Sequence, residues 1–223
     1  MGFGIRIRVS GPRACFTRPE MKAERVSYDV ITPSAARGII EAIYWKPSIR
    51  WAIDRIEVLN EIRFDTFRRN ELESKLSYAN AKKAYEKDAA LYIEASENRQ
   101  QRATTYLRDV SYLIDAHFEM TDCAGEQDDG PEKHYNIVMR RLRKGQHFVH
   151  PVLGCREFPA TVQLVESDES LQGFYRDVPE KDLGYMLYDL DFSNPDSPDP
   201  LFFRAVMRRG IIDVASSREK VVA

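Results

Sequence analysis

Apolar and polar residues alternate in three stretches of the chain, and a fourth stretch is rich in isoleucine and valine. Alternation with a period of two predicts a strand that buries one of its faces. In the first stretch the polar positions include Arg6 and Arg8, so the outer face of that strand is predicted to be basic. The four predicted strands are residues 3–9, 49–62, 112–120 and 158–164.

Two amphipathic helices are predicted between these strands. Thr32 is a suitable N-cap before Pro33, and apolar residues then recur at helical spacing until shortly before Pro47. Pro131 opens the second helix, and Gly145 is a suitable residue to end it. The predicted inward residues are Ala36, Ile39, Ile40 and Ile43 in the first helix and Ile137, Val138 and Leu142 in the second.

The order strand, helix, strand, strand, helix, strand is typical of an α+β protein with a ferredoxin-like (RRM-like) βαββαβ domain. We expect this domain to span residues 1–165 and to contain a charged, partly helical excursion at residues 68–102. Residues 166–223 are richer in Gly, Asp and Pro and contain two short apolar runs. They predict a small C-terminal antiparallel β-sheet extension.

The composition is that of an ordinary soluble protein, with 43% hydrophobic and 30% charged residues among 223. No apolar run approaches the roughly 20 residues of a membrane span, and the N-terminal residues lack the features of a secretory signal. We therefore expect a cytoplasmic protein without membrane contact. The wide spacing of Cys15, Cys123 and Cys155 argues against a disulfide scaffold or a zinc ribbon and predicts three buried thiols.

The net charge of −2 does not indicate nucleic-acid binding, but the distribution of basic residues does. They are concentrated in the N-terminal strand and the loop after it, and on the second helix. Such clusters are commonly only solvated, yet a ferredoxin-like fold can place these two elements along one groove that contacts phosphates. The candidate RNA-binding residues are Arg6, Arg8, Arg13, Lys22, Lys46, Arg140, Arg141 and Arg143.

Tyr44, Lys133 and His134 form a candidate catalytic set for RNA cleavage without a metal. In that reaction the ribose 2′-hydroxyl attacks the adjacent phosphate, which requires a base, an acid and a cation for the developing phosphorane charge. His134 lies in the first turn of the second helix, where we expect its ring at the rim of the apolar seam. Both His134 and Tyr44 also have a structural interpretation, as a satisfied histidine and as an aromatic anchor of a helix end.

The other histidines and Trp45 are interpreted as structural. His117 is expected to form hydrogen bonds on the polar face of its strand, and His147 and His150 are spaced too loosely for a metal pair. Trp45 is expected to lie in the core. The chain contains no P-loop, dinucleotide fingerprint, nucleophile elbow or zinc-protease motif, and residues 128–129 are interpreted as an acidic turn. Metal-dependent hydrolysis is therefore the less favoured enzyme class, and no cofactor is expected.

Four separated segments carry a family resemblance: SYDVITPSAARGIIEAIYWKP (27–47), YLRDVSYLIDAHF (106–118), KHYNIVMRRLRKGQ (133–146) and LGCREF (153–158). They resemble the CRISPR-associated Cas-five family of subtype I-C. The resemblance implies a ferredoxin-like, repeat-associated domain followed by a small β-sheet extension. It also implies an endoribonuclease that cuts precursor CRISPR RNA at the base of the repeat hairpin, without a metal, and leaves a 2′,3′-cyclic phosphate and a 5′-hydroxyl.

The same resemblance implies that the product stays bound by its 5′ handle while backbone, large and small subunits of the type I-C interference complex (Cascade) assemble. The family's catalytic tyrosine, in its IYWKP motif, corresponds to Tyr44, and its Lys-His pair corresponds to Lys133 and His134. We assign His134 as general acid or base, Lys133 as the electrostatic stabiliser, and Tyr44 as a second proton-transfer or orienting group. His117, in the family's AHF segment, is kept as structural.

Two other functions remain open from the sequence. One is a non-catalytic subunit that only holds the 5′ handle of the CRISPR RNA; the candidate catalytic set argues against it, because a scaffold needs no proton-transfer pair. The other is general binding of duplex nucleic acid, including non-specific binding of DNA. The residues that would carry it are Arg140, Arg141, Arg143 and Lys144.

Overall fold

The computed structural model describes residues 3–123, 125, 129–166, 173–194 and 196–222. Its helices are α1 (Pro33–Ile43), α2 (Tyr78–Glu86), α3 (Pro131–Arg143) and a short 3₁₀ helix, η1 (Ala215–Lys220). Its strands are β1 (Gly4–Ala14), β2 (Arg25–Val26), β3 (Ile49–Val58), β4 (Phe64–Leu72), β5 (Arg99–Met120), β6 (Thr161–Leu164), β7 (Lys181–Asp191), β8 (Asp199–Arg208) and β9 (Ile211–Asp213).

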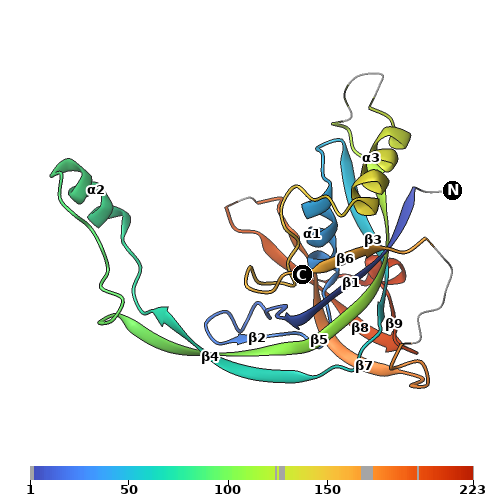
Figure 1. Cartoon of the computed structure of the whole chain (residues 1–223), viewed down its shortest axis with the longest axis horizontal. Coiled ribbons are helices and arrows are strands. Elements are labelled where there is room, and N and C mark those ends of the chain that lie inside the picture. Colours follow the sequence, from blue (N-terminus) through green and yellow to red (C-terminus); the bar gives the residue numbers. More distant parts are fainter. Residues whose placement is uncertain (1–2, 124, 126–128, 167–172, 195, 223) are drawn as a thin grey trace.

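The nine strands of the described residues form one sheet, with the order β6-β1-β5-β3-β9-β8-β7 and with β2 and β4 also paired to β5 (Figure 1). All pairings are antiparallel except that of β2 with β5, which is parallel. The predicted α+β class, dominated by an antiparallel sheet, is therefore confirmed. No helix in the described part of the chain is both long enough and apolar enough to cross a membrane.

The two helices of the core begin and end where the sequence predicts. The Thr32 hydroxyl accepts a hydrogen bond from the Ala35 amide at 3.2 Å and so caps α1. Gly145 follows α3 with a φ of 63°, a left-handed conformation that glycine adopts without strain. The buried side chains of α1 and α3 pack with the inward-facing residues of β1, β3 and β5 in one core cluster. The core therefore lies between the sheet and these two helices.

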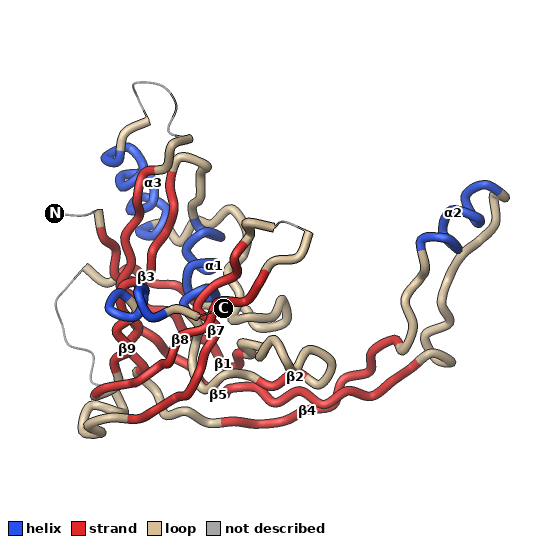
Figure 2. Tube along the Cα trace, turned by 180° about the vertical axis from the view of Figure 1, so that it is seen from behind, coloured by secondary structure: helices blue, strands red, loops and turns tan. Residues whose placement is uncertain are grey.

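The charged excursion expected at residues 68–102 does contain a helix, α2, as a partly helical connection would. Its two ends belong to strands β4 and β5, which form a β-ribbon that the sequence did not predict. Strand β4 pairs with the first half of β5, from Arg68 opposite Ala103 to Leu72 opposite Arg99. Figures 1 and 2 show this ribbon projecting from the body with α2 at its far end. Neither face of the ribbon's outer part packs on the core. Polar residues therefore occupy both faces, and the alternation that reveals a strand is absent.

Helix α2 contributes nothing to the core. None of its residues, all of which the structure describes, is buried, and Tyr78 and Tyr85 are 85% and 89% exposed. The backbone amide of Glu73 donates to the carbonyl of Asn98 at 3.0 Å, which brings the two ends of this tip together.

The strands after residue 166 extend the main sheet. Strand β9 pairs with β3, β8 with β9, and β7 with β8, so the predicted β-rich extension is hydrogen-bonded to the N-terminal part of the sheet. The boundary between domains at residues 165 and 166 stays a prediction.

Two expectations about burial are wrong. Trp45 is 53% exposed, because the chain has left α1 and turned outward, and it is Trp51 on β3 that fills the core. Cys123 is exposed in the loop after β5, whereas Cys15 and Cys155 are buried as predicted. A local pattern does not show which of two neighbouring apolar residues a chain turn will bury.

We expect the tip of the projecting ribbon, residues 74–97 with helix α2, to be dispensable for folding. Replacing residues 74–97 by a two-residue Asn-Gly turn between Glu73 and Asn98 should change the free energy of unfolding by less than about 1 kcal/mol, because the removed residues bury nothing. Ile40→Ala in the core should cost about 2–5 kcal/mol. Urea unfolding monitored by circular dichroism measures both; a loss in the trimmed protein as large as that in Ile40→Ala would contradict the expectation.

Candidate active site

Tyr44 lies where α1 ends, and its position is set by the backbone. It is the C-cap residue of α1, with an extended conformation, and its amide donates to the Ile40 carbonyl at 2.9 Å. Its own carbonyl accepts a hydrogen bond from the Trp51 indole at 2.9 Å. The side chain is 2% exposed. Helix and core together therefore hold this phenol in one orientation.

His134 projects from the first turn of α3 onto the same point. Its Nδ1 lies 2.7 Å from the Tyr44 hydroxyl, and its ring is 1% exposed and packs edge-on against Phe118. Its Nε2 lies 3.1 Å from an oxygen of Asp129 and 3.4 Å from the Ser48 hydroxyl. The ring is therefore more deeply buried than the rim position predicted from the sequence.

These contacts are consistent with one tautomer of a neutral imidazole. A neutral ring has one N–H donor and one acceptor nitrogen, and the Asp129 carboxylate is an acceptor only. Nδ1 then accepts from the hydroxyl of Tyr44, and the hydrogen lies on Nε2, 3.1 Å from the Asp129 carboxylate. Phenol, imidazole and carboxylate thus follow one another in space, and the carboxylate would stabilise a proton gained by the ring.

The surroundings of Tyr44 and Asp129 shift the pKa values of both groups. Burial is the main cause that raises the pKa of Tyr44, the Asp129 carboxylate raises it further, and the Arg141 guanidinium opposes them. The Ser48 hydroxyl is the main cause that lowers the pKa of Asp129, with help from the Gly125 amide, His134 and Lys133. The phenol therefore keeps its proton at neutral pH, and the carboxylate stays charged.

Lys133 is the accessible member of the predicted set. Its ammonium lies 3.7 Å from the oxygen of Asp129 that contacts His134, and its side chain is 52% exposed. The structure thus brings Lys133 and His134 to one carboxylate and places Tyr44 on the other side of the imidazole ring. An exposed cation at this place can reach a phosphate group.

Sequence reasoning missed three neighbours of this set. Asp129 was interpreted as part of an acidic turn, Ser48 was not considered, and Arg141 was counted only among the candidate RNA-binding residues. The Arg141 guanidinium lies 5.2 Å above the Tyr44 ring and donates to the Ile43 carbonyl at 2.6 Å. For Asp129 a local signal existed, because a carboxylate just before a helix that begins at Pro131 can bind residues of the first turn.

The other candidate RNA-binding residues do not form a single cluster. Arg6 and Arg143 line one hollow of about 470 Å³, so the first strand and α3 do share a cavity, with the ion-pair partners Asp115 and Glu166 in the same lining. Arg8 donates to the Ser111 hydroxyl at 3.1 Å, and the Arg13 guanidinium lies 5.7 Å from the Tyr106 ring centre. Lys22, Lys46 and Arg140 are exposed.

The remaining histidines lie outside the site. His117 Nδ1 is 2.8 Å from a carboxylate oxygen of Asp54, a hydrogen bond on the polar face of the sheet as expected. The rings of His147 and His150 pack edge to face, with their centres 5.0 Å apart.

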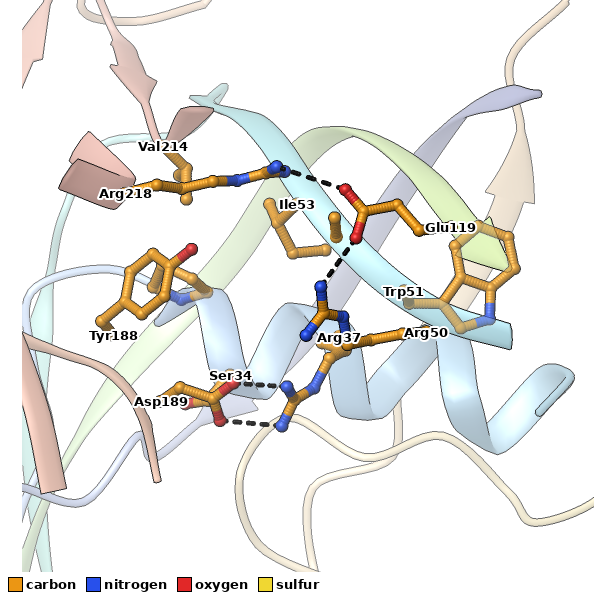
Figure 3. Close-up of a pocket in the computed structure, with 12 residues that line it drawn as sticks. Ser34, Arg37, Arg50, Trp51, Ile53, Glu119, Tyr188, Asp189, Val214 and Arg218 are labelled. Atoms are coloured by element: carbon orange, nitrogen blue, oxygen red, sulfur yellow. Dashed lines mark hydrogen bonds and ion pairs between the residues drawn. The ribbon is translucent and has the colours of Figure 1, made fainter. Parts of the chain in front are cut away.

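A separate pocket of about 210 Å³ lies between α1, β3 and β7 and is rich in arginine (Figure 3). Each of its arginines faces a carboxylate. Arg37 forms a bidentate pair with Asp189, and Arg50 and Arg218 both face Glu119. Arg218 also pairs with Asp54 at 3.3 Å, so each of the three arginines has a carboxylate partner within the protein. The Arg37–Asp189 pair fastens α1 to β7.

Comparison with known proteins gives consistent results over nearly the whole chain. The family model described as "CRISPR-associated protein (Cas_Cas5)" matches residues 4–215. The chain is 50% identical over 214 residues to "CRISPR pre-crRNA endoribonuclease Cas5d" of Mannheimia succiniciproducens, with 94% of each chain covered. It is 37% identical over 231 aligned positions to the protein of the same name from Thermus thermophilus, with 96% of this chain and 92% of the relative covered.

Solved structures agree with these matches. One described as "Crystal Structure of CRISPR-associated Protein" superposes with a TM-score of 0.69 at 28% identity and covers 99% of this chain and 96% of its own. The functionally uncharacterized protein SMU1763c from Streptococcus mutans gives a TM-score of 0.68, also at 28% identity, and covers 99% and 97%. Fold and sequence together define a CRISPR-associated protein. The chain belongs to the Cas5 family, in its subtype I-C.

The Asp129 carboxylate should contribute stability that disappears in acid. Because the pKa of Asp129 is lower in the folded protein than in the unfolded chain, its ionised form stabilises the fold above the ordinary carboxyl pKa of about 3.9, and this contribution is lost as the pH falls through the folded value. Melting temperatures of wild type and Asp129→Asn should therefore differ most near neutral pH and converge in acid. Asp122→Asn, an exposed change in the same loop, is the control; parallel curves for wild type and Asp129→Asn would contradict the assignment.

Proposed function

We propose that this chain is a metal-independent endoribonuclease that cleaves precursor CRISPR RNA at the base of the repeat hairpin. The observation that carries the proposal is the 2.7 Å contact between Tyr44 and His134, with Asp129 and Lys133 beside it. The endoribonuclease names of the two relatives, over nearly their full length, support the activity and the RNA substrate.

In the proposed mechanism the 2′-hydroxyl of the scissile ribose attacks the neighbouring phosphorus. As it attacks, its proton moves to the Tyr44 oxygen while the phenol proton passes to Nδ1 of His134, and the Asp129 carboxylate stabilises the imidazolium that forms. Lys133 stabilises the charge of the phosphorane. The imidazolium then returns the proton, through the phenol, to the departing 5′-oxygen. The products are a 2′,3′-cyclic phosphate and a 5′-hydroxyl.

Burial sets a condition on this mechanism. Tyr44 and His134 are 2% and 1% exposed, so the bound RNA must displace neighbouring groups to reach the phenol. Lys133 and Arg141 lie on either side of the pair and are the cations that would receive the phosphate. The same burial favours the alternative function, a non-catalytic subunit that holds the 5′ handle, in which the pair only fixes the ends of α1 and α3.

We further propose that the chain keeps the 5′ handle of its product and joins backbone, large and small subunits in the type I-C interference complex. The strand order β6-β1-β5-β3, with α1 and α3 as the two crossover helices, supports a ferredoxin-like classification of this RNA-binding part. Arg6 and Arg143, which share a hollow, are proposed to contact the RNA backbone together with Arg8, Arg13, Lys22, Lys46, Arg140 and Arg141. Non-specific binding of duplex DNA by the basic end of α3 is proposed as a secondary property.

Cleavage of the matching repeat hairpin in excess EDTA tests the activity. Wild type is expected to cut the RNA but not a substrate with a 2′-deoxyribose at the scissile position. His134→Ala and Tyr44→Phe are expected to lose about 10²–10⁴-fold in rate while still binding the hairpin, because they remove proton transfer rather than RNA contacts. His147→Ala, an exposed histidine outside the site, is the control.

Binding without cleavage by wild type would leave the handle-binding subunit as the function. Cleavage only with a divalent ion, or cleavage of the 2′-deoxy substrate, would exclude the 2′-hydroxyl mechanism. Binding with a steep salt dependence and no preference for the hairpin would indicate a general nucleic-acid binder.

Lys133→Met should separate catalysis from binding. We expect the single-turnover rate to fall about 10²-fold with little change in the Kd for the hairpin, because Lys133 acts on charge that develops only in the transition state. Lys144→Met, an exposed lysine at the other end of α3, should leave the rate unchanged. A Lys133 variant that weakens binding but cuts normally once saturated would assign this lysine to RNA binding alone.

A further inference from the structure

Two buried cysteines that the proposed nuclease does not use lie against one another, where the end of β1 meets the loop before β6. Cys15 follows the end of β1, and Cys155 lies in the loop before β6; they are 0% and 9% exposed. The Cys155 thiol donates to the Cys15 carbonyl oxygen at 3.7 Å, which places the two cysteines in direct contact. The Cys15 amide also donates to the Leu153 carbonyl at 3.0 Å, so the two backbones run side by side.

Gly154 makes this approach possible. Its φ is 85°, and a Cβ atom at this position would lie 2.0 Å from the carbonyl oxygen of Cys15. Any other residue would push the loop away from β1 and separate the thiols. The glycine and cysteine of the segment LGCREF therefore serve to place one sulfur beside the other.

A guanidinium completes the cluster. Arg25 on β2 lies 3.5 Å from the Cys155 sulfur and also pairs with Glu71 and Glu157, each at 3.8 Å. Hydrogen bonding from Cys15, together with the charge of Arg25, lowers the pKa of the Cys155 thiol, whereas the pKa of Cys15 is raised. A thiolate held by an arginine, next to a second thiol, has the arrangement of a nucleophilic and a resolving cysteine.

We propose that Cys15 and Cys155 form an oxidisable dithiol site that hydrogen peroxide converts into an intramolecular disulfide. The Cys155 thiolate attacks one oxygen of the peroxide, the O–O bond breaks, and a sulfenic acid and hydroxide form. The Cys15 sulfur then attacks the sulfenic sulfur, the S–S bond forms, and hydroxide leaves. The hydroxide takes up the proton of Cys15, so two thiols and one peroxide give a disulfide and two waters.

Peptide mapping of the full-length wild-type protein tests this directly. The protein is treated at neutral pH with increasing hydrogen peroxide, unfolded, alkylated and digested with trypsin without reduction. We expect a cross-linked peptide that joins residues 14–22 to residues 145–156, with a mass lower by two hydrogens than the sum of the parts. It should accumulate with peroxide and disappear after dithiothreitol.

Variants with both thiols intact test the role of the guanidinium. Arg25→Gln should slow the cross-link about tenfold, because it removes the cation that stabilises the thiolate. Arg69→Gln is the matched control, because Arg69 pairs with the same Glu71 and Glu157, whereas it is Arg25 that contacts the Cys155 sulfur. Cys123→Ser should form the cross-link as wild type does, since Cys123 is the exposed cysteine.

Several results would overturn the proposal. One is full alkylation of Cys15 and Cys155 after peroxide treatment. Others are oxidation of Cys123 alone and a disulfide that includes Cys123. An equal rate of cross-linking in wild type and Arg25→Gln would contradict the proposed role of the guanidinium. Because the first measurement needs wild type alone, the proposal is tested even if a variant fails to fold.

Discussion

Strand β5 is the element on which the rest of the structure depends. Its 22 residues hydrogen-bond mainly to β1 and β3 along the second half and to β4 along the first, where β2 pairs with it as well. Parts of the chain that are far apart in sequence thus share one backbone template, and their hydrophobic faces are held toward α1 and α3. The same strand continues out of the body as one strand of the β4–β5 ribbon. The hydrogen-bonded sheet of the core therefore runs without a break into the ribbon.

The candidate active site is a product of this arrangement. Tyr44 lies at the end of α1 and His134 at the start of α3, 90 residues apart in sequence, and they meet because both helices pack on the same layer. The hydrogen bond between Tyr44 and His134 joins the end of α1 to the start of α3, and it is shielded from water. The Asp129 carboxylate lies on the other side of the imidazole, 3.1 Å from Nε2, so the ring stands between a phenol and a negative charge.

The sequence predicted the elements whose residues face two different environments. Alternation in β1 and at the end of β5, and the helical spacing after Thr32 and Pro131, reflect burial of one face and exposure of the other. The ribbon around residues 68–72 and 99–102 was missed because neither face packs on the core there. For the site, the family resemblance pointed to Tyr44, Lys133 and His134, but Ser48 and Arg141 join them only through tertiary contacts that no local pattern records.

The bidentate pair between Arg37 and Asp189 has a consequence for how the molecule comes into being. It ties the helix that carries Tyr44 to strand β7, which the ribosome adds among the last elements of the chain. During synthesis the N-terminal half leaves the ribosome first. Helix α1 therefore has no Asp189 to pair with until most of the polypeptide has been made. The Arg37–Asp189 pair therefore forms late in synthesis, and a translation product that stops before β7 has α1 without its link to the C-terminal strands.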